Sequence, residues 1–91
     1  MQFIWHPAKA LSNLRKHGVS FEEATTVFGD PLARIFDDPD HSLEEQREII
    51  IGQSTQGRLL LVSFTEHGKF TRIISARRPD ATERRDYEEN I

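Results

Sequence analysis

The apolar residues of the C-terminal half fall in short runs of alternating or continuous hydrophobicity, a pattern typical of β-strands. Three such runs follow one another at 47–52, 58–65 and 69–77. The connections between them are so short that consecutive strands must pair antiparallel. Two shorter runs, at 2–5 and 32–36, predict further strands. The pattern therefore predicts an antiparallel sheet of four to five strands.

Between the first strand and the next, the spacing of apolar residues becomes helical. Pro7 suits the first position of a helix, where its missing N–H costs nothing, and Gly18 suits the position just past the end. The helix is expected to end at about His17, with Leu11 and Leu14 on one face. This face is expected to pack on the sheet.

A second helix is predicted from the capping-box spacing of Ser20 and Glu23, in which each residue satisfies a backbone N–H of the other. Its apolar face comprises Phe21, Ala24, Val27 and Phe28. Gly29 and Pro31 are expected to end it. Two helices in succession can together cover one face of the sheet.

A last helix is expected after Pro79. Asp80 and Glu83 repeat the capping-box spacing, and Tyr87 is the only large apolar residue of the predicted helix. The predicted fold is therefore α+β, with two N-terminal helices packed on an antiparallel four- to five-stranded sheet and a C-terminal helix. No change of composition marks a linker, so residues 1–91 are expected to form a single domain.

Composition narrows the class of protein. With 36% apolar and 30% charged residues, a chain of 91 residues can form one modest core. The lack of cysteine excludes disulfides and thiolate metal sites. No apolar run approaches the roughly 20 residues of a membrane span, and the N-terminus does not have the pattern of a signal peptide. We therefore expect a cytoplasmic protein that does not enter a membrane.

Charge is unevenly distributed, although the net charge is only −3. Residues 37–48 are mainly acidic and residues 67–86 mainly basic. The guanidinium groups of Arg72 and Arg77 can hold phosphate or carboxylate through two hydrogen bonds. In a regular strand these two side chains point to opposite faces, so they reach one phosphate only through a bulge, or through Arg77 and Arg78 at the strand end. The strand either binds an anion or pairs with acids of the same chain.

Several motifs resemble those of the BrnT-type toxin family. They are WHPAK at 5–9, KHGVSFEEA at 16–24 and RIISAR at 72–77, with Asn13, Arg47, Ile51-Gly52, Glu83-Arg84 and Tyr87. The resemblance covers nearly the whole chain. It departs from the family pattern at His6, where the family usually has Asp, a better helix N-cap, and at Pro79, where it often has Ala.

The resemblance implies a fold similar to that of RelE-type ribonucleases and a role as the toxin of a type II toxin–antitoxin pair. It also implies a BrnA-like antitoxin with a ribbon-helix-helix domain, so that DNA is contacted only through the antitoxin. The substrate would be RNA, whose 2′-hydroxyl is the nucleophile. Cleavage then needs a base, an acid and positive charge at the phosphate, but no metal or other cofactor.

For this chemistry the sequence provides positive charge more clearly than acid–base groups. The candidates for catalysis are Arg77, Arg72, Ser75, Arg47 and His17, and those for RNA binding are Arg78, Lys16, Lys9 and His67. Arg77 beside the Ser75 hydroxyl is the first choice. His17 lies at a predicted helix C-terminus, where the helix dipole favours its protonated form.

Each candidate also has a structural interpretation. Arg72 and Arg47 can pair with carboxylates, for which the candidates are Glu45, Glu48 and Glu83. His17 can cap its helix, His67 can be an ordinary turn residue, and both lysines can simply be solvated. Trp5 can stack on a base or lie in the core, and Tyr87 can anchor the last helix.

Two further alternatives follow from the charges. The acidic segment 37–40 invites a metal interpretation, but its spacing is not that of a calcium-binding loop, and a solvated loop is the simpler interpretation. The basic strand is also compatible with a non-catalytic module that binds RNA or an acidic protein partner. This second function would need no acid–base pair.

Overall fold

A computed structural model describes residues 1–38 and 46–89 of the chain. Five strands form one sheet in the order β1-β5-β4-β3-β2. The strands are β1 (Gln2–Ile4), β2 (Arg34–Asp37), β3 (Arg47–Gln53), β4 (Leu59–His67) and β5 (Phe70–Arg77). The helices are α1 (Pro7–His17), α2 (Phe21–Thr26) with the 3₁₀ turn η1 (Val27–Gly29), and α3 (Ala81–Glu89). The predicted α+β class is confirmed.

The prediction of a wholly antiparallel sheet is wrong at one edge. β3, β4 and β5 pair antiparallel, as their short connections require, and β2 joins β3 in the same way. β1 instead pairs parallel with β5, with Gln2 opposite Phe70 and Ile4 opposite Arg72. No short turn joins β1 to its neighbour in the sheet, so nothing local fixes its direction. The sheet is therefore mixed.

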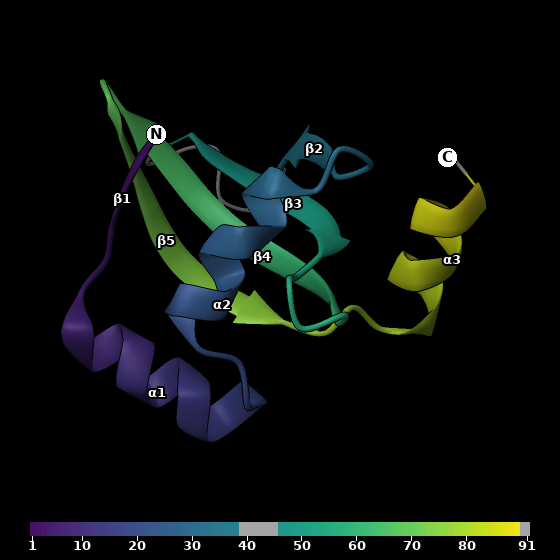
Figure 1. The fold of residues 1–91 in the computed structure, drawn as a ribbon, viewed down its shortest axis with the longest axis horizontal. Coiled ribbons are helices and arrows are strands. Elements are labelled where there is room, and N and C mark those ends of the chain that lie inside the picture. Colours follow the sequence, from purple (N-terminus) through teal and green to yellow (C-terminus); the bar gives the residue numbers. More distant parts are fainter. Residues whose placement is uncertain (39–45, 90–91) are drawn as a thin grey trace.

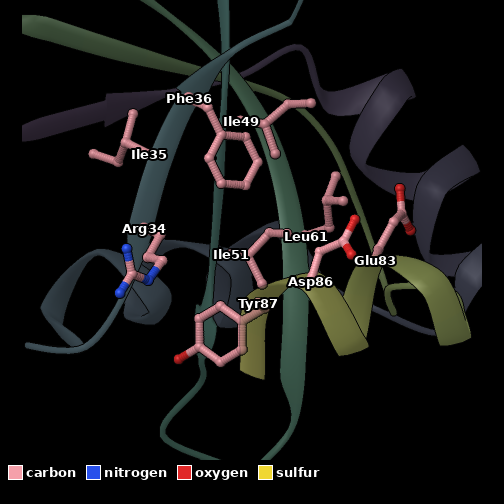
Figure 2. A pocket seen from close by; sticks show the side chains of 9 residues that line it. All are labelled: Arg34, Ile35, Phe36, Ile49, Ile51, Leu61, Glu83, Asp86 and Tyr87. Atoms are coloured by element: carbon pink, nitrogen blue, oxygen red, sulfur yellow. The ribbon is translucent and has the colours of Figure 1, made fainter. Parts of the chain in front are cut away.

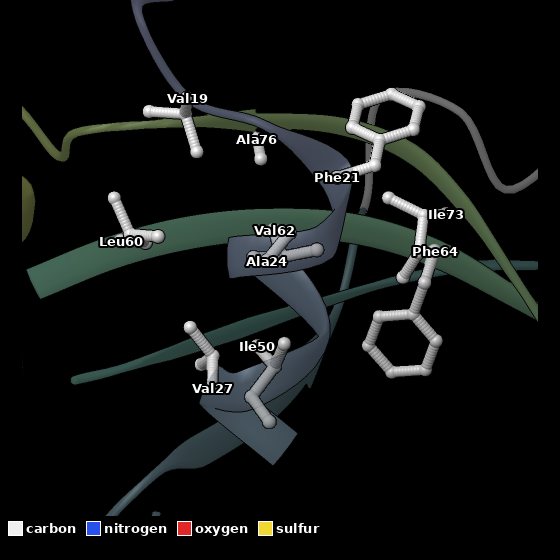
Figure 3. Packing of buried hydrophobic residues seen from close by; sticks show 10 residues of the cluster. All are labelled: Val19, Phe21, Ala24, Val27, Ile50, Leu60, Val62, Phe64, Ile73 and Ala76. Carbon is white, nitrogen blue, oxygen red and sulfur yellow. The ribbon is translucent and has the colours of Figure 1, made fainter. Parts of the chain in front are cut away.

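α2 lies on one side of the sheet and α1 lies along the edge of β5, while α3 packs on the side opposite α2 against β3 and β4 (Figure 1). The main core fills the space between α2 and the sheet (Figure 3). It comprises Val19, Phe21, Ala24, Val27, Ile50, Leu60, Val62, Phe64, Ile73 and Ala76. Trp5 packs edge-on against Phe21, with ring centroids 5.9 Å apart, so it has the core role and not that of a base-stacking platform.

A smaller cluster lies on the opposite face. Tyr87 of α3 is buried against Ile51, Leu59 and Leu61, and its hydroxyl donates to the carbonyl of Leu32 at 3.4 Å. Burial raises the pKa of Tyr87. The interpretation of Tyr87 as the anchor of the last helix is therefore confirmed.

The face that α1 turns to the sheet is not the predicted one. Leu11 and Leu14 are 50% and 46% exposed, whereas Ala10 packs against the core and Asn13 is buried. The polar residue Asn13 lies inside because its amide hydrogen-bonds backbone groups. The apolar spacing predicted the helix correctly but not its orientation.

The Asn13 side chain completes the edge of β5. Its amide nitrogen donates to the carbonyls of Val19 and Ala76, at 2.9 and 2.8 Å, and its Oδ1 accepts from the N–H of Ala76 at 3.0 Å. β1 covers only residues 70–72 of β5, so this part of the edge has no strand beside it. The amide takes the place of a neighbouring strand and satisfies backbone groups that would otherwise be buried without partners.

The ends of α1 show how the chain sets this geometry. His6 is the N-cap, and its Nδ1 accepts from the N–H of Ala8 at 3.2 Å. The imidazole thus performs the capping role that the sequence did not predict for it. Gly18 has φ of 70°, a left-handed conformation that suits glycine, and its N–H donates to the carbonyl of Leu14.

Only half of the first capping box is formed. The Ser20 hydroxyl accepts from the N–H of Glu23 at 3.0 Å, but the Glu23 carboxylate turns into the protein. There it accepts from the Ser54 hydroxyl at 2.7 Å and from two guanidinium nitrogens of Arg58. Hydrogen bonding from Arg58 lowers the pKa of Glu23, against the opposing effect of burial. The buried charge joins α2 to the turn before β4.

Acid is expected to destabilise the fold through Glu23. Because its pKa is lower in the folded chain, the stability that its ionised form contributes is present above the ordinary value of 4.5 and is lost as the pH falls through the folded value. Glu23→Gln should lower stability at neutral pH and flatten the loss in acid. Urea denaturation across this range measures both effects. Glu22→Gln, at an exposed neighbour, is the control, and equal curves for the two variants would contradict the assignment.

Candidate functional site

A β-bulge in β5 decides which face its arginines occupy. Thr65 of β4 is opposite Arg72 and Leu61 is opposite Arg77, but the register shifts between Ser63 and Phe64, where β5 has an extra residue. Thr65 and Leu61 are four positions apart on β4 and so share a face. Arg72 and Arg77 therefore lie on the same face as well. In a regular strand these two side chains would point to opposite faces, and the bulge brings them to the same one.

The resulting surface lies on the side of the sheet away from α2, and we call it the arginine face. It consists of three rows across β3, β4 and β5: Arg47, Thr65 and Arg72; Ile49, Ser63 and Ser75; and Ile51, Leu61 and Arg77. Arg47 and Arg72 are separated by two strand spacings, about 10 Å. The Nε of Arg72 lies 3.5 Å from Oγ1 of Thr65. The structure thus brings four predicted residues, three arginines and Ser75, onto one face.

Arg77 is held by a carboxylate of α3. Its two terminal nitrogens donate to Oε1 and Oε2 of Glu83, at 2.8 and 2.9 Å. Hydrogen bonding with Glu83 raises the pKa of Arg77, and the same bonds lower the pKa of Glu83. Glu83 also closes the predicted capping box, since it accepts from the N–H of Asp80 while Asp80 accepts from the N–H of Glu83, both at 2.8 Å. Arg77 therefore pairs with an acid of the same chain.

Glu83 was expected as a possible partner of Arg72 or Arg47, but the arginine that it pairs with is Arg77. Its spacing from Asp80 identified it as a helix cap, and that prediction is confirmed. The spacing carries no sign that the same carboxylate reaches back to β5. Of the other carboxylates considered as arginine partners, Glu45 lies outside the described residues.

A cavity of about 330 Å³ opens on the arginine face between β2, β3 and α3 (Figure 2). Its lining is apolar on the floor and charged at the rim: Ile35, Phe36, Ile49, Ile51, Leu61 and Tyr87, with Arg34, Glu83 and Asp86. Phe36 is 44% exposed although it is a large aromatic residue. The cavity adjoins the row that ends at Arg77. No sequence pattern indicated this cavity, because its walls come from four elements, β2, β3, β4 and α3.

The remaining candidates are distributed over the surface. His67 is exposed at the end of β4, two positions beyond Thr65 and therefore on the outer end of the arginine face. His17, Lys9 and Lys16 are exposed on α1, which lies along the edge of β5. The structure does not bring these three to the arginines.

Arg78 lies next to a second, largely polar cavity of about 240 Å³. Arg58 and Arg84 line it as well, but Arg58 is paired with Glu23 and Arg84 with Glu88 at 2.8 Å. This cavity lies past the Arg77 end of the sheet, where β3 and β4 begin their connecting turn. It extends the basic surface but has no acid–base group.

Neither a metal centre nor a membrane span is found in the described part of the chain. Within 1–38 and 46–89, no group of three or more metal-ligating side chains is close enough together to hold an ion. Of the acidic segment 37–40, for which a solvated loop was the preferred interpretation, positions 39–40 lie outside the described residues. None of the described helices is long and apolar enough to cross a membrane.

These features define a small α+β protein with α2 on one face of a mixed sheet and a basic, partly covered opposite face. A family model described as the ribonuclease toxin BrnT of type II toxin–antitoxin systems matches residues 5–83. The chain therefore belongs to the BrnT family of ribonuclease toxins. Membership implies an antitoxin partner and an RNA target.

A solved structure agrees with the fold. The crystal structure of the Brucella abortus ribonuclease toxin BrnT matches with a TM-score of 0.69 at 24% sequence identity, over 88% of this chain and 97% of that chain. At this identity the match supports the fold alone. A sequence search of curated proteins finds no match.

Proposed function

We propose that this protein is a metal-independent endoribonuclease that cuts RNA on the arginine face and is neutralised by a BrnA-like ribbon-helix-helix antitoxin. The proposal extends to residues 1–91 acting as one RelE-like toxin domain in the cytoplasm, with DNA contacted only through the antitoxin. The observation that carries it is the bulge in β5, which gathers Arg72, Ser75 and Arg77 beside Arg47. Family membership supplies the reaction class.

Arg47 and Arg72 are the groups best placed to stabilise the transition state. When the 2′-hydroxyl of RNA attacks the adjacent phosphorus, negative charge builds on the phosphate oxygens. A phosphate above Thr65 would have a guanidinium on each side, from two different strands. Guanidinium forks can each hold two phosphate oxygens and stay charged at any physiological pH. Both features suit a site that works without a metal.

His67 is the better placed of the two histidine candidates for proton transfer. It follows Thr65 on the same face at a distance along β4 of about 7 Å. In its neutral form the imidazole can take the proton of the 2′-hydroxyl as the oxygen bonds to phosphorus. The bond from phosphorus to the 5′-oxygen then breaks, that oxygen takes up a proton from water, and the imidazolium returns its proton to the solvent. The products are a 2′,3′-cyclic phosphate and a free 5′-hydroxyl.

Ser75 and Arg77 continue the face beyond this pair. Ser75 is opposite Ser63, so two hydroxyls lie between the two arginine-bearing rows. The fork of Arg77 already binds Glu83, and a phosphate would have to compete for it. Arg78 and the cavity beside it would bind the RNA farther along its chain. They would also bind an acidic segment of the antitoxin.

Cleavage of single-stranded RNA in excess chelator tests the proposal. Wild type should cut at an unchanged rate, and Arg72→Ala should be slower by about 10²–10³-fold, the usual loss for one charge-stabilising donor. Arg15→Ala, at an exposed arginine of α1, is the matched control. Loss of cleavage on chelation would contradict metal independence. RNA binding without cleavage under any condition would favour the alternative of a non-catalytic basic module.

A further inference from the structure

We propose that the cavity between β2, β3 and α3 binds a nucleobase of the RNA, next to the phosphate that is cut. The inference rests on the proposed function, because it takes single-stranded RNA as the ligand. It adds a specificity site to a face that otherwise offers only charge and hydroxyl groups.

The position of the cavity supports this assignment. Ile49 on its floor belongs to the row of Ser63 and Ser75, and Ile51 to the row of Arg77 (Figure 2). The cavity thus begins one row away from Arg47 and Arg72, the arginines that would hold the phosphate. Its volume of about 330 Å³ lies at the lower end of the range of roughly 300–1,000 Å³ for small-molecule sites. A base attached to a phosphate on the arginine face can reach it without a change in the fold.

Phe36 gives the cavity an aromatic wall. It is opposite Ile49 on the edge strand β2, and it remains 44% exposed. Its ring points into the space that Ile51 and Tyr87 also face (Figure 2). Unpaired bases of single-stranded RNA are commonly recognised by stacking on such side chains. An exposed aromatic ring with Arg34 nearby therefore favours a base over an aliphatic ligand.

The rim of the cavity carries charges of both signs. Arg34 approaches from β2, and Glu83 and Asp86 from α3 (Figure 2). A purely apolar side chain of a protein partner would desolvate these groups without replacing their hydrogen bonds. A base edge offers donors and acceptors together, and guanine presents both O6/N7 acceptors and an N2 donor. We expect guanine to bind best.

Binding of short 2′-O-methyl RNA tests the inference, since this RNA lacks the nucleophile and cannot be cut. Two oligomers, one with its bases and one abasic, separate base contacts from phosphate contacts. Phe36→Ala should weaken binding of the base-bearing oligomer by about five- to a hundredfold, as expected for one stacked base, and leave the abasic oligomer unaffected. Phe36→Leu should show an intermediate loss, and a guanine oligomer should bind best. Leu11→Ala, equally exposed on α1, is the control.

Each other result is informative. Equal effects of Phe36→Ala on both oligomers, or no effect, would overturn the inference, as would a wild type that binds neither. If the variant weakened only the antitoxin complex, the cavity would be a protein-docking site instead. Base-dependent binding by a wild type that cuts no RNA would refute the proposed function and leave the cavity assignment standing. Normal cleavage together with unchanged RNA binding by Phe36→Ala would refute the cavity assignment and leave the proposed function standing.

Discussion

Arg77→Ala is expected to lower the rate of RNA cleavage by about 10²–10³-fold, as for other single charge-stabilising groups. It should also destabilise the fold, because the Glu83 carboxylate loses both hydrogen bonds from the guanidinium. The cost should be about 1 kcal/mol, near the upper end for surface ion pairs, because the two side chains are 38% and 29% exposed and water can replace part of the lost bonds. Arg77→Lys should rescue only in part, since a point charge does not reproduce the fork.

Glu83→Gln separates a catalytic Arg77 from a purely structural one. If the pair only holds α3 in place, removing either charge should reduce stability and cleavage alike. If Arg77 acts on phosphate, Glu83→Gln should keep the cleavage rate near that of wild type, because it releases the guanidinium from a competing carboxylate. Cleavage rates and thermal melting of the variants, measured side by side, decide between the two. An inactive Glu83→Gln that melts like Arg77→Ala would assign the pair to structure.

The position of the arginines illustrates what sequence can and cannot supply. Alternation and short turns predicted β3, β4 and β5 and their antiparallel pairing, because these depend on neighbouring residues. No glycine or proline lies next to Ile74 in the sequence to indicate a bulge there. The bulge arises from the register with β4, which is a tertiary property. From the sequence alone, one can say only that Arg72 and Arg77 share a face if the strand contains a bulge.

The direction of β1 and the orientation of α1 could not be predicted for a related reason. β1 pairs with a strand that comes some 65 residues later in the chain, as Gln2 opposite Phe70 shows, so no local signal applies. In α1 the leucine spacing indicated the wrong face. A count of apolar residues does not include the hydrogen bonds that make burial of Asn13 favourable.

The sequence predicted the basic and hydroxyl residues of the site, but not the cavity beside them. Arg47, Arg72, Ser75 and Arg77 were all identified from residue type and family motifs, and the structure places them on one face. The alternation in β4 carried a usable signal for the hydroxyls, since Ser63 and Thr65 have the parity opposite to the core residues. The cavity had no such signal. Residues of four elements form it, and only the folded chain brings them together.

Asn13→Asp is expected to destabilise the fold by about 3 kcal/mol, since the carboxylate can donate to neither carbonyl that the amide nitrogen now binds and each buried unsatisfied group costs about 1–3 kcal/mol. Its oxygens can still accept from the N–H of Ala76, but a buried negative charge beside two carbonyl oxygens adds to the cost of the two lost donors, so the value of about 3 kcal/mol is a lower bound. Asn13→Ala removes all three bonds without adding a charge. Urea unfolding at neutral pH measures the losses, with Ser12→Ala on the exposed side of α1 as the control.

The same substitution should affect cleavage beyond its effect on stability. Ala76 immediately precedes Arg77, and its backbone is fixed on one side by β4 and on the other by Asn13. Loosening that edge should shift the strand end that carries Arg77 and Ser75. Cleavage by Asn13→Asp, measured where the variant is fully folded, should therefore fall below wild type while Ser12→Ala is unchanged. Equal rates for folded Asn13→Asp and wild type would limit Asn13 to holding α1 on the sheet.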